Sequence, residues 1–551
     1  MVRALLSAVG VEVRGLHQAA YLLAFFALLS QVLALLRDRL LAGTFGAGET
    51  LDLYYAAFRL PDFLFATVAS LLSLYALLPI LAKLTPDDVT GFLERCLLVF
   101  FVAMGAVAAA AYVAVPYLLP IITPGLANGT LEQLTRILLL QPILLGASNI
   151  IAALTQLRHR FLLYSISPLL YNLGIIGGIV FLYPRMGVEG LAWGVVFGAA
   201  LHVLIQLPFW GRTGTPTIGW RDTFVHLGEI LKLSVPRTLA LAAGQISLLV
   251  LIALASLLPG GSIAIFMFAF NLQAVPLTVI GVSYSVAAFP TLSRLHAAGE
   301  RGEFVRHIET ALRHILFWAI PAMVFVIVLR AQLVRAILGS GVFDWPETRL
   351  VAAALAIFIV SLSAQSITML VARGYYAAGN TAKPLIFGIS AVVVSVTSGL
   401  ILMHFFEYWD LWRMFLEEML RVEGISGTVV LMLALAYCLG GLVQAALGLY
   451  FFTRDFGVAR RPLLTLFFQS FSAAVLGGAA AYAVLAATGE AINIDTFTGV
   501  VFQGLSAAFV GGIVTIATLA LLRNRELFET YAAVHKRVAP PKVVIEPTDV
   551  S

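Results

Sequence analysis

Charged residues are scarce in this chain of 551 residues, where Asp, Glu, Lys and Arg together make up 11% of the sequence. A soluble domain carries about 25% charged residues, so the composition excludes an ordinary soluble protein. Hydrophobic residues make up 61%, and the mean hydropathy is +0.97. Because one spanning helix needs about 20 apolar residues, the chain is long enough for about a dozen crossings or more. We therefore predict an all-α polytopic membrane protein.

Cysteine is nearly absent as well, since the sequence holds only Cys96 and Cys438. They lie far apart in or beside apolar runs, which excludes a disulfide framework and a thiol-based metal site. The nine histidines show no ligand spacing with acidic or thiol neighbours. No residue pattern pairs a nucleophile with a base, so we predict no enzyme. We expect no metal site and no cofactor.

The basic residues that are present lie in short loops between apolar runs, which argues against a nucleic-acid partner despite a pI near 9.2. An even number of crossings places both termini on one side, and that side carries most of the 34 Lys and Arg residues. The positive-inside rule then predicts that both termini are cytoplasmic. Fourteen spans are predicted near residues 17–42, 52–82, 92–120, 132–157, 161–183, 187–211, 227–258, 262–293, 308–338, 348–375, 382–404, 427–453, 463–487 and 498–522.

An internal repeat divides the predicted helices into two similar sets. Residues 57–60 align with 269–272, and after a one-residue gap 79–84 align with 290–295. Two copies of six helices share one orientation, which predicts two pseudo-symmetric lobes around a central cavity, and transporters place their substrate at such an interface. The predicted parts are an N-terminal lobe 1–222, a C-terminal lobe 223–455, helices 13 and 14 in 456–522, and a cytoplasmic tail 523–551, polar and partly disordered.

Charged residues interrupt the first two apolar runs, at Arg37, Asp38, Asp52 and Arg59. A charge at membrane depth costs at least a few kcal/mol unless it faces water or a partner. These four residues are therefore candidates for a polar site inside the bundle. For Arg37, Asp38 and Asp52, a purely structural role is the alternative to a binding role. Arg37 can pair with Asp38 or Asp52 to close the helix 1–2 hairpin, and Asp52 can cap the start of helix 2.

Asn271 lies where the repeat places the partner of Arg59. Its amide suits a sugar or a peptide, and it also suits a hydrogen bond between helices.

A different feature is the loop Phe405–Gly424, in which apolar and charged residues alternate at helical spacing. This pattern predicts an amphipathic helix lying on the outer membrane interface.

Two motifs resemble those of a known family. RDRLLAGTFGAGETLDLYYAAFRLPDFL, residues 37–64, is similar to the signature of the MurJ/MviN family of lipid II flippases. RGYYAAGNTAKP, residues 373–384, is similar to the family's motif between helices 10 and 11. The family belongs to the multidrug/oligosaccharidyl-lipid/polysaccharide exporter superfamily. The resemblance covers nearly the whole chain.

The resemblance implies a transporter of the bacterial cytoplasmic membrane with a V-shaped cavity that opens alternately to either face. Its cargo would be lipid II, the undecaprenyl-diphosphate-linked precursor of peptidoglycan. Arg37, Asp38 and Asp52 match charged positions in or near the family's cavity, and Arg59 matches a basic one. Cations would hold the diphosphate, and a groove beside helices 13 and 14 would take the lipid tail. The partners implied are a polyprenyl-diphosphate-linked glycan and membrane lipids.

Several charged positions of the family differ here. Gln31 replaces an arginine, Phe65 and Ala66 replace paired arginines, and Asn271 and Ala274 replace an arginine and a glutamate. Fewer cations keep a second interpretation open, in which the cargo is another lipid-linked glycan or a small molecule. A third interpretation is a scaffold that does not transport and that binds cell-wall synthases through the amphipathic helix.

Overall fold

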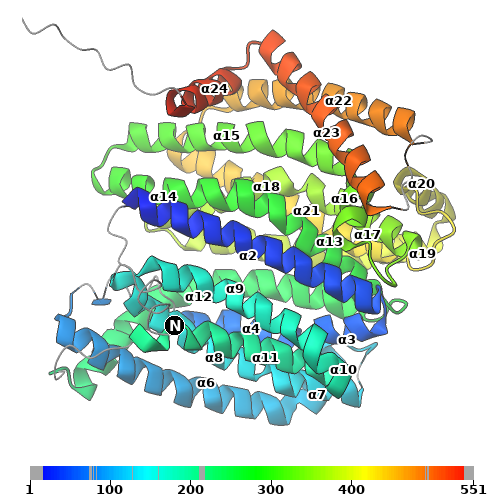
Figure 1. The fold of residues 1–551 in the computed structure, drawn as a ribbon. Helices are drawn as coiled ribbons and strands as arrows, with labels where there is room; N and C mark the ends of the chain where they lie inside the picture. Colours follow the sequence, from blue (N-terminus) through cyan, green and yellow to red (C-terminus); the bar gives the residue numbers. More distant parts are fainter. Residues whose placement is uncertain are drawn as a thin grey trace, which may run out of the picture.

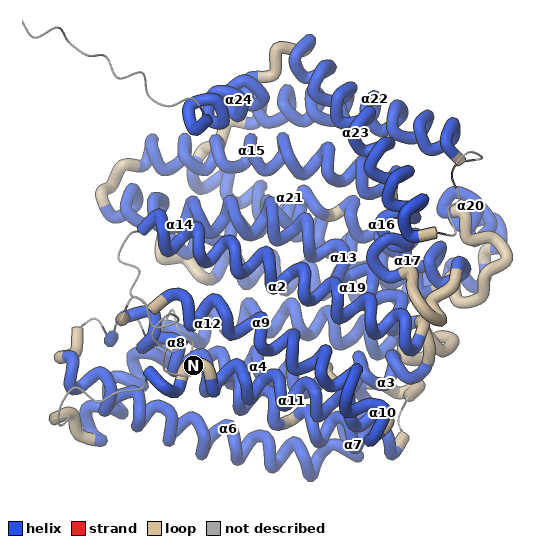
Figure 2. The backbone as a smooth tube through the Cα atoms, viewed as in Figure 1, coloured by secondary structure: helices blue, strands red, loops and turns tan. Residues whose placement is uncertain are grey.

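The computed structural model describes residues 16–538, except 73–76, 78–79, 82, 127, 159, 210–216, 490–491 and 493–495. Within these residues the secondary structure is helical throughout, with no strand (Figures 1 and 2). The prediction of an all-α protein is therefore confirmed. The apolar runs form the helices because a helix satisfies every backbone hydrogen bond within one segment, as a lipid environment requires.

The helices follow the predicted spans closely. Those of the first half are α2 (Leu16–Phe45), α3 (Glu49–Ala57), α4 (Arg59–Thr67), α6 (Pro86–Ile122), α7 (Gly129–Leu138), α8 (Leu140–Leu157), α9 (Phe161–Gly177), α10 (Tyr183–Met186) and α11 (Val188–Leu204). Those of the second half are α12 (Trp220–Ala255), α13 (Ser262–Leu277), α14 (Ser283–Ala297), α15 (Arg301–Val328), α16 (Arg330–Leu338), α17 (Trp345–Val360), α18 (Leu362–Ala377), α19 (Ala382–Tyr408), α20 (Asp410–Leu420) and α21 (Val430–Phe456). The last three are α22 (Arg460–Thr488), α23 (Phe497–Leu521) and α24 (Arg525–Val538).

Nine helical stretches in the described ranges are long and apolar enough to cross a membrane, some of them joining neighbouring helices such as α7 and α8, and the number is ten if α17 and α18 form one span bent by 43°. Other predicted spans are broken into shorter pieces, as where α3 meets α4. The chain is thus a multi-pass membrane protein, while the number fourteen stays a prediction. Predicted helix 10 is bent where α17 meets α18, whereas predicted helix 4 runs as one span over Gly129–Leu157.

The two halves of the chain form two stacks of helices in Figure 1, with α2 between them and α22 to α24 outermost. Long α12 joins both stacks. Leu227 and Ile230, near its start, pack in a core with α6 and α8, while Leu251 and Ile252 pack in the core shared with α13. The division into lobes at residues 222 and 455 stays a prediction.

Glycines let some helices approach very closely. A Cβ atom placed on Gly178, in the π-helical turn Gly178–Leu182, would lie 2.6 Å from the Cα atom of Gly194 in α11. A Cβ atom on Gly174 would lie 2.2 Å from the Cα atom of Gly198. Small residues in this register bring membrane helices into backbone contact, and here they join α9 to α11.

The predicted amphipathic helix is present as α20, which starts at Asp410. Leu416 and Leu420 are buried against the body of the protein, whereas Leu411 and Met414 are exposed. Apolar side chains therefore occupy two faces of α20.

Within the predicted tail, Arg525–Val538 forms the helix α24. Glu526 of this helix is buried and forms an ion pair with Arg313 of α15. Residues 539–551 lie outside the described residues.

Candidate functional site

Arg37 and Asp38 form an ion pair on α2, as one of the structural alternatives predicted. Arg37 Nη2 and Nε donate to Asp38 Oδ1 at 2.8 and 3.0 Å. The Asp38 side chain is almost fully buried, whereas the Arg37 side chain keeps 20% of its surface exposed. The Arg37 guanidinium is therefore not fully enclosed, although Asp38 occupies its Nε–Nη2 edge.

This pair is the centre of a chain of polar contacts that joins the two halves of the protein. Arg37 Nη1 donates to Asn172 Oδ1 of α9 at 3.3 Å, and Asn172 Nδ2 donates to Ser30 Oγ of α2 at 3.3 Å. On the other side, Asn271 Nδ2 of α13 donates to Asp38 Oδ2 at 3.1 Å. Asn271 thus makes a hydrogen bond between helices, which was the predicted structural alternative to binding a sugar or a peptide.

Asp52 caps a helix, although not the one predicted. Its Oδ2 accepts from Gly261 N at 2.6 Å and its Oδ1 accepts from Ala264 N at 2.8 Å, so it caps α13. The N-cap of its own helix, α3, is Gly48, which makes no side-chain cap. Asp52 is 2% exposed. A carboxylate is favoured there because the first N–H groups of a helix lack partners within that helix.

Further contacts tie the α2–α3 turn to the second half of the chain. Arg39 Nη1 donates to the carbonyl oxygens of Ala336 and Ile337, at the end of α16, at 2.7 and 3.1 Å. Val342 N donates to Gly43 O at 3.1 Å. Glu347 Oε1, at the start of α17, accepts from Ala47 N at 2.6 Å. We call these contacts, together with those of Asp52, the interlobe clamp.

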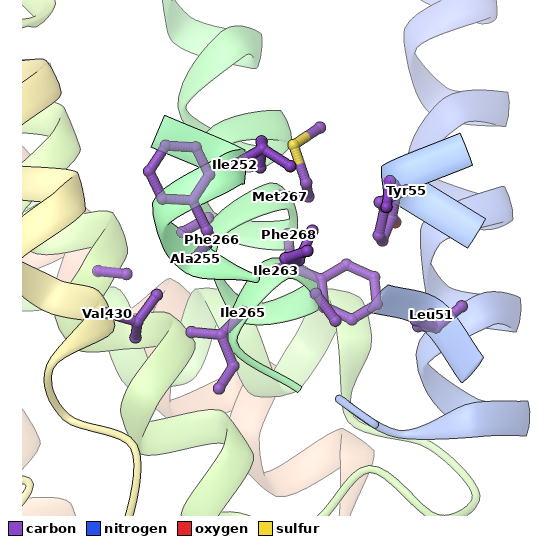
Figure 3. Packing of buried hydrophobic residues seen from close by; sticks show 14 of the residues in the cluster. Leu51, Tyr55, Ile252, Ala255, Ile263, Ile265, Phe266, Met267, Phe268 and Val430 are labelled. Carbon is purple, nitrogen blue, oxygen red and sulfur yellow. The ribbon is translucent and has the colours of Figure 1, made fainter. Parts of the chain in front are cut away.

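The apolar core continues between the halves beside the clamp. Figure 3 shows Leu51 and Tyr55 of α3 opposite Ile263 and Phe268 of α13. The rings of Tyr55 and Phe268 meet edge to face, with centroids 5.9 Å apart. The Tyr55 hydroxyl is buried without a hydrogen-bond partner in this state. The clamped end of the interface is therefore packed as well as hydrogen-bonded.

Arg59 lies in a separate polar group inside the first half. Its Nη2 lies 3.7 Å from Asp62 Oδ2, and its Nε donates to Tyr55 O at 3.1 Å. The Arg59 side chain is 5% exposed, while that of Asp62 is 32% exposed. Asp62 is therefore the more accessible member of this pair. Of the five predicted site residues, Arg37, Asp38 and Asn271 are joined directly, and Asp52 and Arg59 are not.

An apolar groove lies between the second half and the last helices. It has a volume of about 520 Å³ and lies between α15, α18, α21 and α22. Its lining includes Leu316, Ile367, Ala445, Leu449, Leu463 and Phe467. A groove with this lining suits a hydrocarbon chain.

Sequence reasoning missed two polar residues at these sites. Asp62 follows Arg59 by three residues on the same helix, a spacing that brings side chains together and could have identified it. Asn172 binds Arg37 from 135 residues away. No local pattern indicates that contact.

Comparison with known proteins gives a consistent result. Residues 41–501 match the family model described as "Lipid II flippase MurJ". The lipid II flippase MurJ of Burkholderia cenocepacia is 27% identical over 401 residues, which cover 70% of this chain and 77% of that protein. The probable lipid II flippase MurJ of Haemophilus influenzae is 28% identical over 407 residues, covering 69% and 79%.

Solved structures show the same fold. A structure described as "Lipid II flippase MurJ, inward closed conformation" superposes with a TM-score of 0.71 and 21% identity, covering 92% of this chain and 100% of that one. An inward-facing multidrug resistance transporter of the MATE family in the MOP superfamily gives a TM-score of 0.61 and 16% identity, covering 79% and 96%. The family match spans most of the sequence, and the chain therefore belongs to the MurJ family.

Proposed function

We propose that this protein moves lipid II from the cytoplasmic to the outer face of the inner membrane by alternating access. The family match and the names of the relatives support this cargo. The observation that carries the mechanism is the polar chain from Asn172 through Arg37 and Asp38 to Asn271. It places paired charges in the apolar bundle, on a contact between the two halves.

The clamp defines which end of the interface is closed in this state. It holds the end that carries the α2–α3 turn, and most Lys and Arg residues belong to loops at the opposite end. By the positive-inside rule the clamped end faces the outside, with both termini in the cytoplasm. The two lobes then separate at the cytoplasmic end to admit cargo, and at the clamped end to release it.

Arg37 is the residue we assign to the diphosphate. A guanidinium binds phosphate oxygens through two parallel N–H bonds, and Arg37 already presents such donors to Asp38. When the halves move apart, Asp38 loses Asn271, and a diphosphate can replace part of the pairing around Arg37. Asp38 and Asn271 would thereby couple cargo binding to separation of the halves. Arg59 and Asp62 form a second polar pair inside the first half, while Asp52 holds the clamp.

The polyprenyl tail would occupy the apolar groove beside α22, outside the two halves. The apolar lining of the groove gives a hydrocarbon chain surroundings as apolar as lipid, whereas the charged interface would expose it to polar groups. The head group and the tail are therefore expected to travel by different routes.

A second candidate is a flippase for a different lipid-linked glycan. It is favoured by the pairing of the two predicted site arginines with carboxylates, Arg37 with Asp38 and Arg59 with Asp62. Such pairs carry no net charge, which weakens the attraction for a diphosphate relative to two free cations. A scaffold role through α20, with cell-wall synthases as partners, remains the alternative outside transport.

The test is rescue of a bacterium depleted of its own lipid II flippase. Cells expressing this protein are labelled with a membrane-impermeant reagent for lipid II exposed on the outer surface, and membrane expression is measured in parallel. Restored exposure supports the proposal. Normal expression without exposed lipid II contradicts lipid II as the cargo, and binding to a panel of other lipid-linked sugars then identifies the second candidate.

A further inference from the structure

A polar pocket lies away from the interface between the halves. It has a volume of about 510 Å³ and lies between α16, α17, α20, α22 and α23. Figure 1 places α16, α17 and α20 at the same end of the molecule as the α2–α3 turn. The pocket lining includes Arg330, Gln332, Arg349, Arg421, Tyr482 and Gln503, and no carboxylate.

Three arginines line this one pocket, and two of them have no carboxylate partner among the described residues. Arg330 Nη1 donates to Ile327 O at 3.0 Å, and its Nη2 reaches only Leu420 O, at 3.5 Å. Arg421 Nη2 donates to Tyr482 Oη at 2.9 Å. Carbonyl and hydroxyl oxygens orient these cations without neutralising them.

Arg349 differs from the other two because it is paired with Glu423 at 3.2 Å. Its Nε also donates to Arg421 O at 2.6 Å, which fixes the backbone from which Arg421 projects. Arg421 itself has φ +61°, in the left-handed region that few residues other than glycine adopt. The chain thus keeps an arginine at a backbone position that favours glycine.

The charge on the pocket is unfavourable without a ligand. Arg330 and Arg421 carry like charges in the same pocket, and Arg330 is half-buried. Bringing an anion between them would remove the repulsion and supply the missing counter-charge. Phosphate suits this arrangement because guanidinium groups match its oxygens in pairs.

Apolar side chains surround the polar groups and indicate that the anion is carried by a lipid. Met419 and Leu485 line the pocket, and Met419 is 54% exposed. On the same helix, Leu411 and Phe415 are 70% and 56% exposed. An amphipathic helix with such residues lies at the boundary between head groups and acyl chains.

We propose that this pocket binds the phosphate head group of a lipid in the leaflet on the clamped side, between Arg330 and Arg421. Tyr482 positions Arg421, and the exposed apolar face of α20 lies along the acyl chains. The site lies outside the interface between the halves and does not depend on the identity of the transported cargo.

The experiment uses the full-length protein, delipidated in detergent, with binding of phosphatidylglycerol measured by native mass spectrometry. The Arg330→Gln/Arg421→Gln double variant is expected to bind at least about tenfold more weakly than the wild type, since hydrogen bonds to charged groups are among the strong ones. Arg413→Gln is the matched control, because Arg413 lies on the same helix and pairs with Asp410 at the surface. It should bind like the wild type.

Unchanged binding by the double variant, or an equal loss in Arg413→Gln, would overturn the proposal. Inorganic phosphate is added as a competitor, and displacement of the lipid at equal concentration would show a site for free anions and overturn the lipid assignment. Should the double variant fail to fold, Arg421→Gln alone is judged by the same criteria. Arg421→Lys is expected to retain part of the binding.

Discussion

Asp38 of α2 accepts a hydrogen bond of 3.1 Å from Asn271 of α13, and 233 positions separate the two residues in the sequence. This bond lies between the two halves, and the same carboxylate holds Arg37. Opening the clamped end therefore breaks a hydrogen bond to a charged group, which contributes about 1.5 to 3 kcal/mol.

Replacing Asn271 by leucine should raise the population of the state that is open at the clamped end by about tenfold or more, since about 1.4 kcal/mol corresponds to a factor of ten. The measurement is the rate at which a membrane-impermeant maleimide labels a cysteine placed at Ser340, which adjoins the clamp because its Oγ donates to Arg39 O at 3.3 Å. Background labelling by the maleimide is low because the two native cysteines, Cys96 and Cys438, are buried. Ser30→Ala, at the other end of the polar chain, is the control and should leave the rate unchanged. Equal labelling rates in Asn271→Leu and the wild type would contradict the role assigned to the Asp38–Asn271 hydrogen bond.

Asp52 is expected to be structural in this state, since both of its oxygens bind N–H groups of α13. Asp52→Ala leaves Gly261 N and Ala264 N buried without an acceptor, which costs about 1 to 3 kcal/mol. Thermal unfolding of the purified protein should show the loss. Glu49→Ala removes an exposed carboxylate from the same helix and should have little effect. A stable Asp52→Ala protein would show that the cap is dispensable.

Arg59 and Asp62 are best examined as a pair. Arg59→Gln alone leaves Asp62 without its cation inside the bundle, and we expect a loss of stability that Arg59→Gln/Asp62→Asn partly restores. If Arg59 also contacts cargo, the double variant regains stability without regaining flipping. Recovery of both properties would assign the arginine a purely structural role.

Two adjacent glycines provide a test of helix packing. Gly178→Ala places a Cβ atom 2.6 Å from the Cα atom of Gly194, so we expect destabilisation of about 1 to 3 kcal/mol. Gly177→Ala meets no atom within 4 Å and serves as the matched control. The midpoints of thermal unfolding of the two variants should therefore differ. Similar midpoints would show that α9 and α11 separate at little cost.

The sequence alone predicted much of the fold, because long apolar runs in a membrane protein have one stable backbone conformation. The Arg37–Asp38 pair was also predictable, since the two residues are neighbours. The partner of Asp52 was not, because the bonds to Gly261 and Ala264 join residues 209 and 212 positions apart. Helix α24 was missed because the residue that anchors it, Glu526, depends on Arg313 of a distant helix.

The central claim is that the clamped end must open for transport, and a reversible cross-link tests it directly. A Cβ atom on Gly43 would lie 3.4 Å from the Cβ atom of Ser340, close to the separation found in disulfides. In the Gly43→Cys/Ser340→Cys variant, we predict that oxidation stops exposure of lipid II on the outer surface and that a reductant restores it. Each single variant should remain active under oxidation. Undiminished flipping by fully cross-linked protein would contradict the account.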